Sequence, residues 1–471
     1  MNTCESLAAY VARASWDGIS PEARGKLKQH VLDSLGCALG AIPSSTMAAI
    51  RSEQKELNAA GPSTLIGGGT TTPERAAFYN GALVRYLDFM DTFLAVGEAA
   101  HPSDNLAGIL AAAELANASG REFLTALCIA YHIQCRLTSS GVPIMRKGFD
   151  HTIQLSISLA AGMSRVLGLS EKQTAHAIAL CAVSGLSLGA SRTGEHLSNW
   201  KGLASAATAF NCLHNVRLAR AGITGPLHVF KGPMGLEDAL GKHFSIDWDR
   251  ETYDGILACS LKRYDAEFHS QSSLEGILQL RDEHRIRPED VQGVHVDMFK
   301  AGYDMIGGGK YLDPRTVSTK EDADHSLNYL LAVALIDGDV TPDQFTPARI
   351  QAPDVQALLQ RVVCWLSLAY TRDYPQSLKC KIRIGMKDGQ IFEIEKDAYE
   401  GFFRHPMPLE ALIKKFRRLA AKAASEASLQ AVIESVARLE ERSISDLISS
   451  LQNLQPAEST QTAMAGASGA S

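Results

Sequence analysis

The residues best suited to chemistry gather first in two short segments of the N-terminal third of the chain. Asp88, Asp91 and Thr92 fall within one turn or loop, and the sequence HPSDN, which contains His101 and Ser103, follows soon after. Clustered carboxylates, a hydroxyl and an imidazole beside a helix start can transfer protons or orient an oxyacid. The structural alternative is that the aspartates are solvated and the serine only caps the next helix. The residue types alone leave both interpretations open.

Basic residues form two further clusters that could hold an anion. Lys201 follows a tryptophan and precedes a run of small residues typical of a closely packed helix. A helix N-terminus at this point would favour anions, although a solvent-exposed lysine is an equal alternative. Lys262 and Arg263 open the sequence KRYDAEFHSQ, which also contains Glu267 and His269. This second cluster lies at an expected domain boundary, where clefts commonly form.

Two more polar positions complete the set of candidates. His151 ends the sequence GFDH, and Tyr329 lies in DADHSLNY, which opens an apolar helix. Taken alone, a tyrosine in such a helix is more often packed in a core than catalytic.

The sequence has none of the common cofactor or metal motifs. The glycines at 67–69 lack a P-loop lysine, and GGGK at 307–310 is followed by tyrosine, so both segments are expected to be turns. The nine cysteines form no C-x-x-C pair, and no H-E-x-x-H sequence occurs. We therefore expect no bound cofactor, no metal site and no iron–sulfur cluster.

The composition excludes several classes of partner. Among the 471 residues, 46 are Lys or Arg and 52 are Asp or Glu, which gives a net charge of −6 without any basic block. This balance argues against a nucleic-acid surface, so an anionic substrate needs a local cationic pocket. No run of 18 apolar residues predicts a membrane span, and residues 1–10 do not resemble a signal peptide. We expect a cytoplasmic protein with neither a nucleic-acid nor a membrane partner.

The candidate residues need a scaffold, and the first half of the chain predicts helices. Ser20 followed by Pro21 is typical of a helix start, and apolar residues recur at helical spacing after it. Asp104 can cap a later helix, with Gly120 at its end. Residues 1–264 are therefore predicted to form one large helical domain.

The pattern changes after residue 264. Residues 291–299 and 380–386 alternate between apolar and polar residues as strands do, and Asp388-Gly389 predicts a hairpin turn before a returning strand at 391–395. Residues 323–336 are expected to form one helix between these strands.

The predicted fold class is mainly α, with a large all-helical domain and a smaller α+β lid domain. The segment 456–471 has almost no bulky apolar side chains, so it cannot offset the entropy of ordering. The predicted divisions are a helical domain at 1–264, an α+β lid domain at 265–396, a helical segment returning to the first domain at 397–455, and a disordered tail at 456–471.

In this order, the motifs resemble the MmgE/PrpD family. The resemblance covers nearly all of residues 5–420 and rests on NG ahead of LDFMDT, on HPSDN, GFDH, WKG, KRYDAEFHSQ and ADHSLNY. HPSDN and AEFHSQ look more like the 2-methylcitrate dehydratase branch than the cis-aconitate decarboxylase branch. Met90 departs from the pattern, because Asn or Asp is common at its place in LDFMDT.

The resemblance implies an active site between a helical domain and a lid, and commonly a homodimer. Around Lys262 the decarboxylase branch places its histidine differently, so His269 and Glu267 compete for one role. By motif match, the resemblance carries functional roles onto Asp88, Thr92, His101, His151, Lys201, Lys262 and Tyr329.

The implied activity is metal-independent dehydration of 2-methylcitrate or a related 2-alkylcitrate to the corresponding cis-aconitate. The enzyme could serve propionate metabolism, or it could be an alkylcitrate dehydratase of a biosynthetic pathway with a different alkyl pocket. Such a reaction removes a proton next to a carboxylate, where cations stabilise the developing charge, and expels a hydroxyl, which needs an acid. The alternatives are a cis-aconitate decarboxylase and an iminodisuccinate-type epimerase.

In this mechanism Lys201, Lys262 and Arg263 hold the carboxylates of a tricarboxylate substrate. His101 and His269 are the candidate base and acid, in either order, and Tyr329 is a second candidate acid. Asp88 orients a neighbouring imidazole or raises its basicity. The predicted catalytic residues are Asp88, Thr92, His101, Lys201, Lys262, His269 and Tyr329. The predicted substrate-binding residues are Asp91, Ser103, His151, Arg263 and Glu267.

Overall fold

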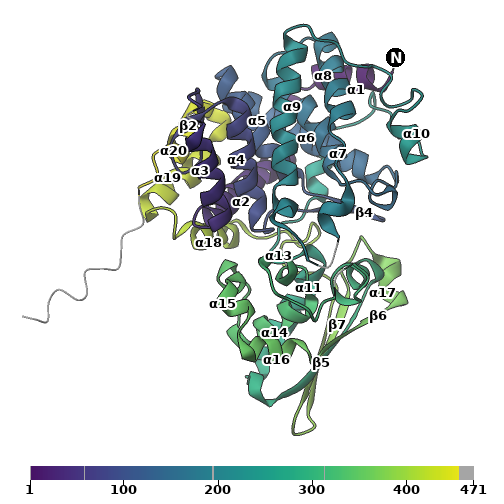
Figure 1. The fold of residues 1–471 in the computed structure, drawn as a ribbon, viewed down its shortest axis with the longest axis vertical. Helices are drawn as coiled ribbons and strands as arrows, with labels where there is room; N and C mark the ends of the chain where they lie inside the picture. Colours follow the sequence, from purple (N-terminus) through teal and green to yellow (C-terminus); the bar gives the residue numbers. More distant parts are fainter. Residues whose placement is uncertain (1, 58, 194–195, 312, 456–471) are drawn as a thin grey trace, which may run out of the picture.

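The protein is described by a computed structural model that covers residues 2–57, 59–193, 196–311 and 313–455. The predicted disordered tail at 456–471 lies outside these described residues. The fold is mainly α-helical, as the sequence predicts (Figure 1). Within the described ranges, no helix has both the length and the hydropathy that crossing a bilayer requires.

Helices dominate the chain before residue 264. The second of them begins as predicted, because the Ser20 hydroxyl accepts a hydrogen bond from the Ala23 amide and Pro21 takes the first position. The helices are α1 (Thr3–Ala12), α2 (Pro21–Ala41), α3 (Ser45–Glu56), α4 (Pro73–Tyr86), α5 (Asn105–Ala116), α6 (Gly120–Ser139), α7 (Thr152–Val166), α8 (Glu171–Ser184), α9 (Ala204–Arg220) and α10 (Leu236–Leu240). Short antiparallel pairs join β1 (Ser63–Thr64) to β2 (Thr70–Thr71) and β3 (Phe93–Ala95) to β4 (Glu98–Ala100).

The predicted ends of α5 are wrong in detail. Asp104 precedes the helix but makes no side-chain cap, and the helix ends at Asn117, whose φ of 47° is tolerated by asparagine. Gly120 instead begins α6, where a Cβ atom would lie 1.7 Å from the carbonyl oxygen of Leu439. The glycine is therefore needed for close approach of the C-terminal chain and not as a helix stop.

The second part of the chain contains a four-stranded sheet. Its order is β6-β5-β7-β8, in which β5 and β6 are parallel and the other pairs are antiparallel. Three strands confirm the alternating pattern, and Gly389 has the positive φ of 90° that the hairpin turn requires. β6 has no counterpart in the sequence-based prediction. The strands are β5 (Val291–Met298), β6 (Val362–Leu366), β7 (Cys380–Met386) and β8 (Ile391–Lys396).

The single helix predicted at 323–336 is broken in the structure. One helix ends at Ala323 and the next begins at Leu327, because the Ser326 hydroxyl accepts a hydrogen bond from the Tyr329 amide and starts a new helix. Asp324 and His325 lie in the break. The helices of this part are α11 (Gln271–His284), α12 (Lys300–Gly302), α13 (Lys320–Ala323), α14 (Leu327–Asp337), α15 (Pro347–Ile350), α16 (Pro353–Leu359) and α17 (Leu368–Asp373).

Two hydrophobic cores organise the described residues. The first combines side chains from residues 4–261 with side chains from 407–451, and the second uses residues 264–402. The last helices therefore pack beside the N-terminal ones, as Figure 1 shows for the yellow and purple ribbons. The domain boundaries and the lid stay a prediction. The last helices are α18 (Leu409–Ala420), α19 (Glu426–Ala437) and α20 (Ile444–Gln452).

Candidate active site

The carboxylate of Asp88 is the centre of a buried cluster of charges. Asp88 follows α4 with a φ of 57°, which turns the chain sharply after the helix. Arg85 pairs with its Oδ1, and the Lys262 ammonium lies 3.2 Å from the same oxygen and 2.5 Å from the Asp88 carbonyl. Burial alone would raise the pKa of Asp88, but Arg85, Lys262 and Lys201 hold it well below its usual value. Asp88 is therefore an ionised anchor for these cations.

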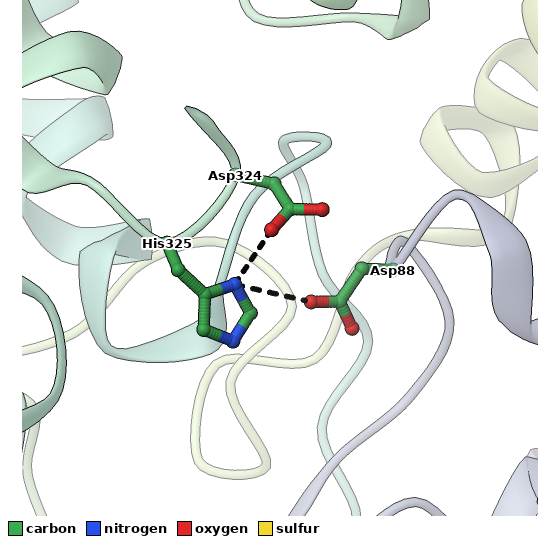
Figure 2. Close-up of side chains that lie close together, drawn as sticks. All are labelled: Asp88, Asp324 and His325. Atoms are coloured by element: carbon green, nitrogen blue, oxygen red, sulfur yellow. Dashed lines mark hydrogen bonds and ion pairs between the residues drawn. The ribbon is translucent and has the colours of Figure 1, made fainter. Parts of the chain in front are cut away.

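The break before α14 brings a second carboxylate to the same cluster. The Lys201 ammonium lies 2.7 Å from Asp324 Oδ1 and 3.5 Å from Asp88 Oδ2, so it bridges the two carboxylates. Figure 2 shows His325 between the same two side chains, with its Nδ1 atom 2.6 Å from Asp324 Oδ1 and 3.9 Å from Asp88 Oδ2. Lys320 pairs with the other Asp324 oxygen at 2.8 Å. Loops more than a hundred residues apart in sequence thus meet at Lys201.

The three groups of Figure 2 could also be considered as metal ligands. One atom each of Asp88, Asp324 and His325 lies within 4.8 Å of the other two. The Lys201 ammonium, however, is within 3.5 Å of all three of these residues. A protonated amine at this position already neutralises the carboxylates and would repel a metal cation. The two carboxylates and the imidazole therefore suit the Lys201 ammonium, which already lies among them, better than a metal ion.

The cluster carries more positive than negative charge. Its cations are Arg85, Lys201, Lys262 and Lys320, and its ionised carboxylates are Asp88 and Asp324. A third carboxyl, Asp265, is fully buried, and neither of its oxygens has a hydrogen-bond partner in the described part of the chain. Burial raises the pKa of Asp265 to about 7. The cluster therefore has surplus positive charge in either state of Asp265, and the surplus is larger below that pH, which suits a polyanionic ligand.

His101 has the geometry of a general base. Its Nδ1 atom lies 2.7 Å from the carbonyl oxygen of Asp91, which can only accept, so Nδ1 carries the hydrogen and Nε2 has the free lone pair. Thr92 Oγ1 lies 3.4 Å from the same nitrogen. Burial, together with the charges of Arg85 and Lys262, holds the pKa of His101 well below its usual value. The ring is therefore neutral at physiological pH and can accept a proton.

His151 lies beside His101, and its surroundings shift its pKa in the opposite direction. The two ring centroids are 5.5 Å apart. His151 Nδ1 is 2.8 Å from Asp150 Oδ1, and its Nε2 is 3.5 Å from Asp104 Oδ2. Burial is the largest single influence and would lower the pKa of His151, but the charge of Asp150 and the hydrogen bonds to Asp104 and Asp150 together raise it. These carboxylates therefore favour the protonated form of the ring beside His101.

Glu267 and His269, which competed for one role in the sequence, form a pair. His269 Nδ1 lies 2.9 Å from Glu267 Oε1, and Glu267 Oε2 accepts a hydrogen bond from the His269 amide. Burial would raise the pKa of Glu267, yet the charge of His269 holds it below its usual value. His269 Nε2 lies 3.4 Å from the Tyr374 hydroxyl. Glu267 thus orients the ring from the Nδ1 side, and the Tyr374 hydroxyl lies near Nε2.

The two histidines approach each other through Phe268. The Phe268 ring lies 4.0 Å from the His269 ring and 6.3 Å from the His101 ring, measured between centroids. One ring belongs to the chain after β4 and the other to the chain before α11. The structure therefore brings the candidate base and acid into contact with one aromatic side chain.

Four predicted residues have their contacts elsewhere. Asp91 accepts a hydrogen bond from the Ser103 amide at 3.0 Å and pairs with buried His30, and the Ser103 hydroxyl is buried. Arg263 is half exposed and pairs with Glu400. The Tyr329 hydroxyl, finally, donates to the backbone carbonyl of Gln344 beside the second core. These contacts position the chain and do not point toward the Asp88 cluster.

Sequence reasoning did not single out several members of the cluster. The missed residues are Arg85, Asp265, Lys320, Asp324, His325 and Tyr374. Asp265 stands inside KRYDAEFHSQ, and Asp324 and His325 stand inside ADHSLNY, so their place in these motifs was the available signal. Arg85 lies two residues before LDFMDT, and nothing local marks Lys320 as different from a surface charge.

The fold and the site define a mainly α-helical protein with buried histidines and a buried cluster rich in cations. Residues 5–249 match the MmgE/PrpD N-terminal domain, and residues 264–441 match the MmgE/PrpD C-terminal domain. The chain therefore belongs to the MmgE/PrpD family.

Characterised relatives are dehydratases and a decarboxylase. The chain is 28% identical over 393 residues to the 2-methylcitrate dehydratase of Cupriavidus necator, covering 77% of this chain and 78% of that protein. It is 28% identical over 391 residues to the 2-methylcitrate dehydratase of Escherichia coli K12, with the same coverage. It is also 25% identical over 442 residues to the cis-aconitate decarboxylase of Mus musculus, covering 88% of this chain and 86% of that protein. The relatives support enzyme status for this chain.

Proposed function

We propose that the protein is a metal-independent hydro-lyase that dehydrates 2-methylcitrate or a related 2-alkylcitrate to the corresponding cis-aconitate. The observation that carries the proposal is the neutral His101 ring, with Nε2 free, next to a cluster of lysines with surplus positive charge. A base beside cations is what removal of a proton next to a carboxylate needs. The names of the relatives supply the substrate class.

In the proposed reaction, Lys201 and Lys262 hold carboxylates of the substrate and stabilise the charge that develops on them. His101 Nε2 takes the proton from the carbon next to a carboxylate. The electron pair of the broken C–H bond forms the double bond as the C–O bond breaks. His269, oriented by Glu267, gives a proton to the departing hydroxyl, which leaves as water. Proton exchange with solvent returns both rings to their starting states.

Substrate entry requires the site to open. His101 is 7% exposed, Lys201 3% and Lys262 0%, so a tricarboxylate cannot reach them without movement. The residues of the site come from the parts of the chain built on both cores. His101 and Lys201 belong to the first part, and His269 and Asp324 belong to the part built on the sheet. We propose that the part built on the second core acts as the lid, opening for substrate and excluding water when it closes. We also propose a homodimer, which light scattering on the purified protein tests.

Incubation with 2-methylcitrate, citrate and cis-aconitate, followed by mass spectrometry, tests the proposed function. The expected product has lost 18 mass units, which is one water, and its formation should persist in chelator. Inhibition by chelator that iron or zinc reverses contradicts metal independence. Ile391→Ala, at an exposed residue of the outer strand β8, is a suitable control for handling of the protein.

The second candidate is a cis-aconitate decarboxylase. It is favoured by the mouse relative, which matches the largest share of this chain among the three relatives described. The same lysines would hold the carboxylates, but the substrate would lose carbon dioxide. Release of carbon dioxide from cis-aconitate, with no dehydration of any citrate, would select this function.

A further inference from the structure

A cavity of about 330 Å³ lies between the β3–β4 hairpin and the chain that follows Tyr374. Phe93, Leu94 and Val96 line it from the hairpin, and Pro375 and Phe403 line it from segments far along the sequence. Among the residues that line this cavity, none carries a charge. Its chemistry therefore contrasts with that of the neighbouring lysine cluster, which suits carboxylates.

Two residues that line the cavity follow directly, along the chain, residues that contact the two proton-transfer histidines. Phe93 follows Thr92, whose hydroxyl oxygen lies 3.4 Å from His101 Nδ1. Pro375 follows Tyr374, whose hydroxyl lies 3.4 Å from His269 Nε2. Ser260, which also lines the cavity, accepts a backbone hydrogen bond from Thr92 at 2.9 Å.

We infer that this cavity binds the 2-alkyl substituent of the substrate and that the enzyme prefers substituents longer than methyl. The inference rests on the proposed function and names its substrate more closely. A water molecule occupies about 30 Å³, and a methyl group is of similar size, so a methyl substituent alone would leave most of the cavity unfilled. Filling an apolar cavity stabilises the bound state in proportion to the apolar area removed from water.

The chain-length profile of kcat/KM tests the inference. Each buried methylene should raise kcat/KM about fourfold, by the usual transfer free energy of a CH₂ group. The rise should continue from citrate through the 2-methyl, 2-ethyl and 2-butyl compounds. It should level off once the chain reaches the rim at Val96, whose side chain is 78% exposed.

The variant Ala258→Leu tests whether this cavity causes the dependence on chain length. Ala258 lines the cavity at the end of a short 3₁₀ helix, Asp254–Ala258, and has no place in the proposed chemistry. The added isobutyl group should remove the gain from methyl to butyl while leaving kcat/KM for citrate within about twofold. Ala221→Leu adds the same group at an exposed position after α9 and should leave the whole profile unchanged.

The outcomes separate the inference from the proposed function. Dehydration of 2-methylcitrate with a flat chain-length profile overturns the inference and leaves the function standing. If no alkylcitrate is dehydrated, the dissociation constants of the same series, measured by calorimetry, decide the matter. If affinity rises with chain length in the natural protein and this rise is absent in Ala258→Leu, the cavity binds the alkyl group although the proposed reaction is wrong. If affinity does not change with chain length, the inference is overturned.

Discussion

The most informative perturbation is Asp265→Asn, because it removes a buried carboxyl without changing its shape. Asp265 is fully buried, its oxygens have no hydrogen-bond partner in the described residues, and burial raises its pKa to about 7. The nearby charges that act on it are those of Lys320, Asp324, Asp88 and Lys262, in that order. In the unfolded chain its pKa is that of an ordinary aspartate, about 3.9.

The sign of the effect follows from which state keeps the proton. Between about pH 4 and pH 7 the folded protein holds a proton on Asp265 and the unfolded chain does not, so the free energy of unfolding falls as pH rises. The raised pKa therefore costs stability above about pH 4, and the cost reaches its full size above pH 7. Over three units this is on the order of 4 kcal/mol, of which about 2 kcal/mol develops between pH 5 and pH 7.

Asparagine resembles the protonated carboxyl at every pH, so Asp265→Asn should gain stability relative to the natural protein as pH rises. The unfolding entropy of about 2 cal/mol/K per residue, taken over 471 residues, gives about 1 °C per kcal/mol if the chain melts as a unit. The difference in melting temperature between variant and natural protein should therefore grow by about 2 °C from pH 5 to pH 7. Calorimetry at matched ionic strength measures it.

Asp324→Asn is the matched control with the opposite behaviour. Burial would raise the pKa of Asp324, but Lys201, Lys320 and His325 hold it far below its usual value. Its carboxylate therefore contributes stability that is present above about pH 4 and is lost as pH falls further. Asp324→Asn should lower the melting temperature equally at pH 5 and pH 7. A melting-temperature difference for Asp265→Asn that stays constant, or shrinks, from pH 5 to pH 7 would refute the assignment of a protonated Asp265.

Three further predictions concern the site. Lys201→Met and Lys262→Met should each lower kcat/KM more than tenfold, because a lost charge-assisted contact costs about 1.5–3 kcal/mol. Near-normal rates in both variants would remove both lysines from the mechanism. In the pH profile of kcat/KM, the acidic limb should lie below pH 6.5, because the pKa of His101 is lowered. The variant His101→Gln should abolish that limb, and His269→Gln should leave it in place. Lys415→Met should raise KM and lower the melting temperature, because the Lys415 ammonium donates to the backbone carbonyls of Phe89 and Lys262. Steady-state kinetics beside thermal melts check it, and a drop in melting temperature with unchanged KM would make Lys415 purely structural.

Much of the fold followed from local patterns in the sequence. The helix at Pro21 and the strands at 291–298 and 380–386 formed where spacing and turn residues predicted them. These patterns work because one face of a helix or strand must be apolar wherever it packs on a core. The prediction of one helix across 323–336 was wrong, because the spacing of apolar residues does not reveal that Ser326 caps a new helix.

The motifs also located the region of chemistry. The family matches confirm the resemblance to MmgE/PrpD proteins, which rested on short polar sequences whose order along the chain is specific. The roles of individual residues were harder to predict. Lys262 and Arg263 were both predicted to hold carboxylates, yet Lys262 is completely buried against Asp88 while Arg263 is half exposed beside Glu400.

What the sequence by itself determined was the family, the mainly helical class and the short segments that carry the polar groups. The tertiary structure alone decided that Lys201 bridges Asp88 and Asp324, and that Glu267 orients His269. It also decided that the Asp265 carboxyl has no hydrogen-bond partner among the residues that the structure describes. The physical reason is that charge state depends on burial and on neighbours within a few ångströms. Those neighbours come from segments more than a hundred residues apart, which meet only when both cores have packed.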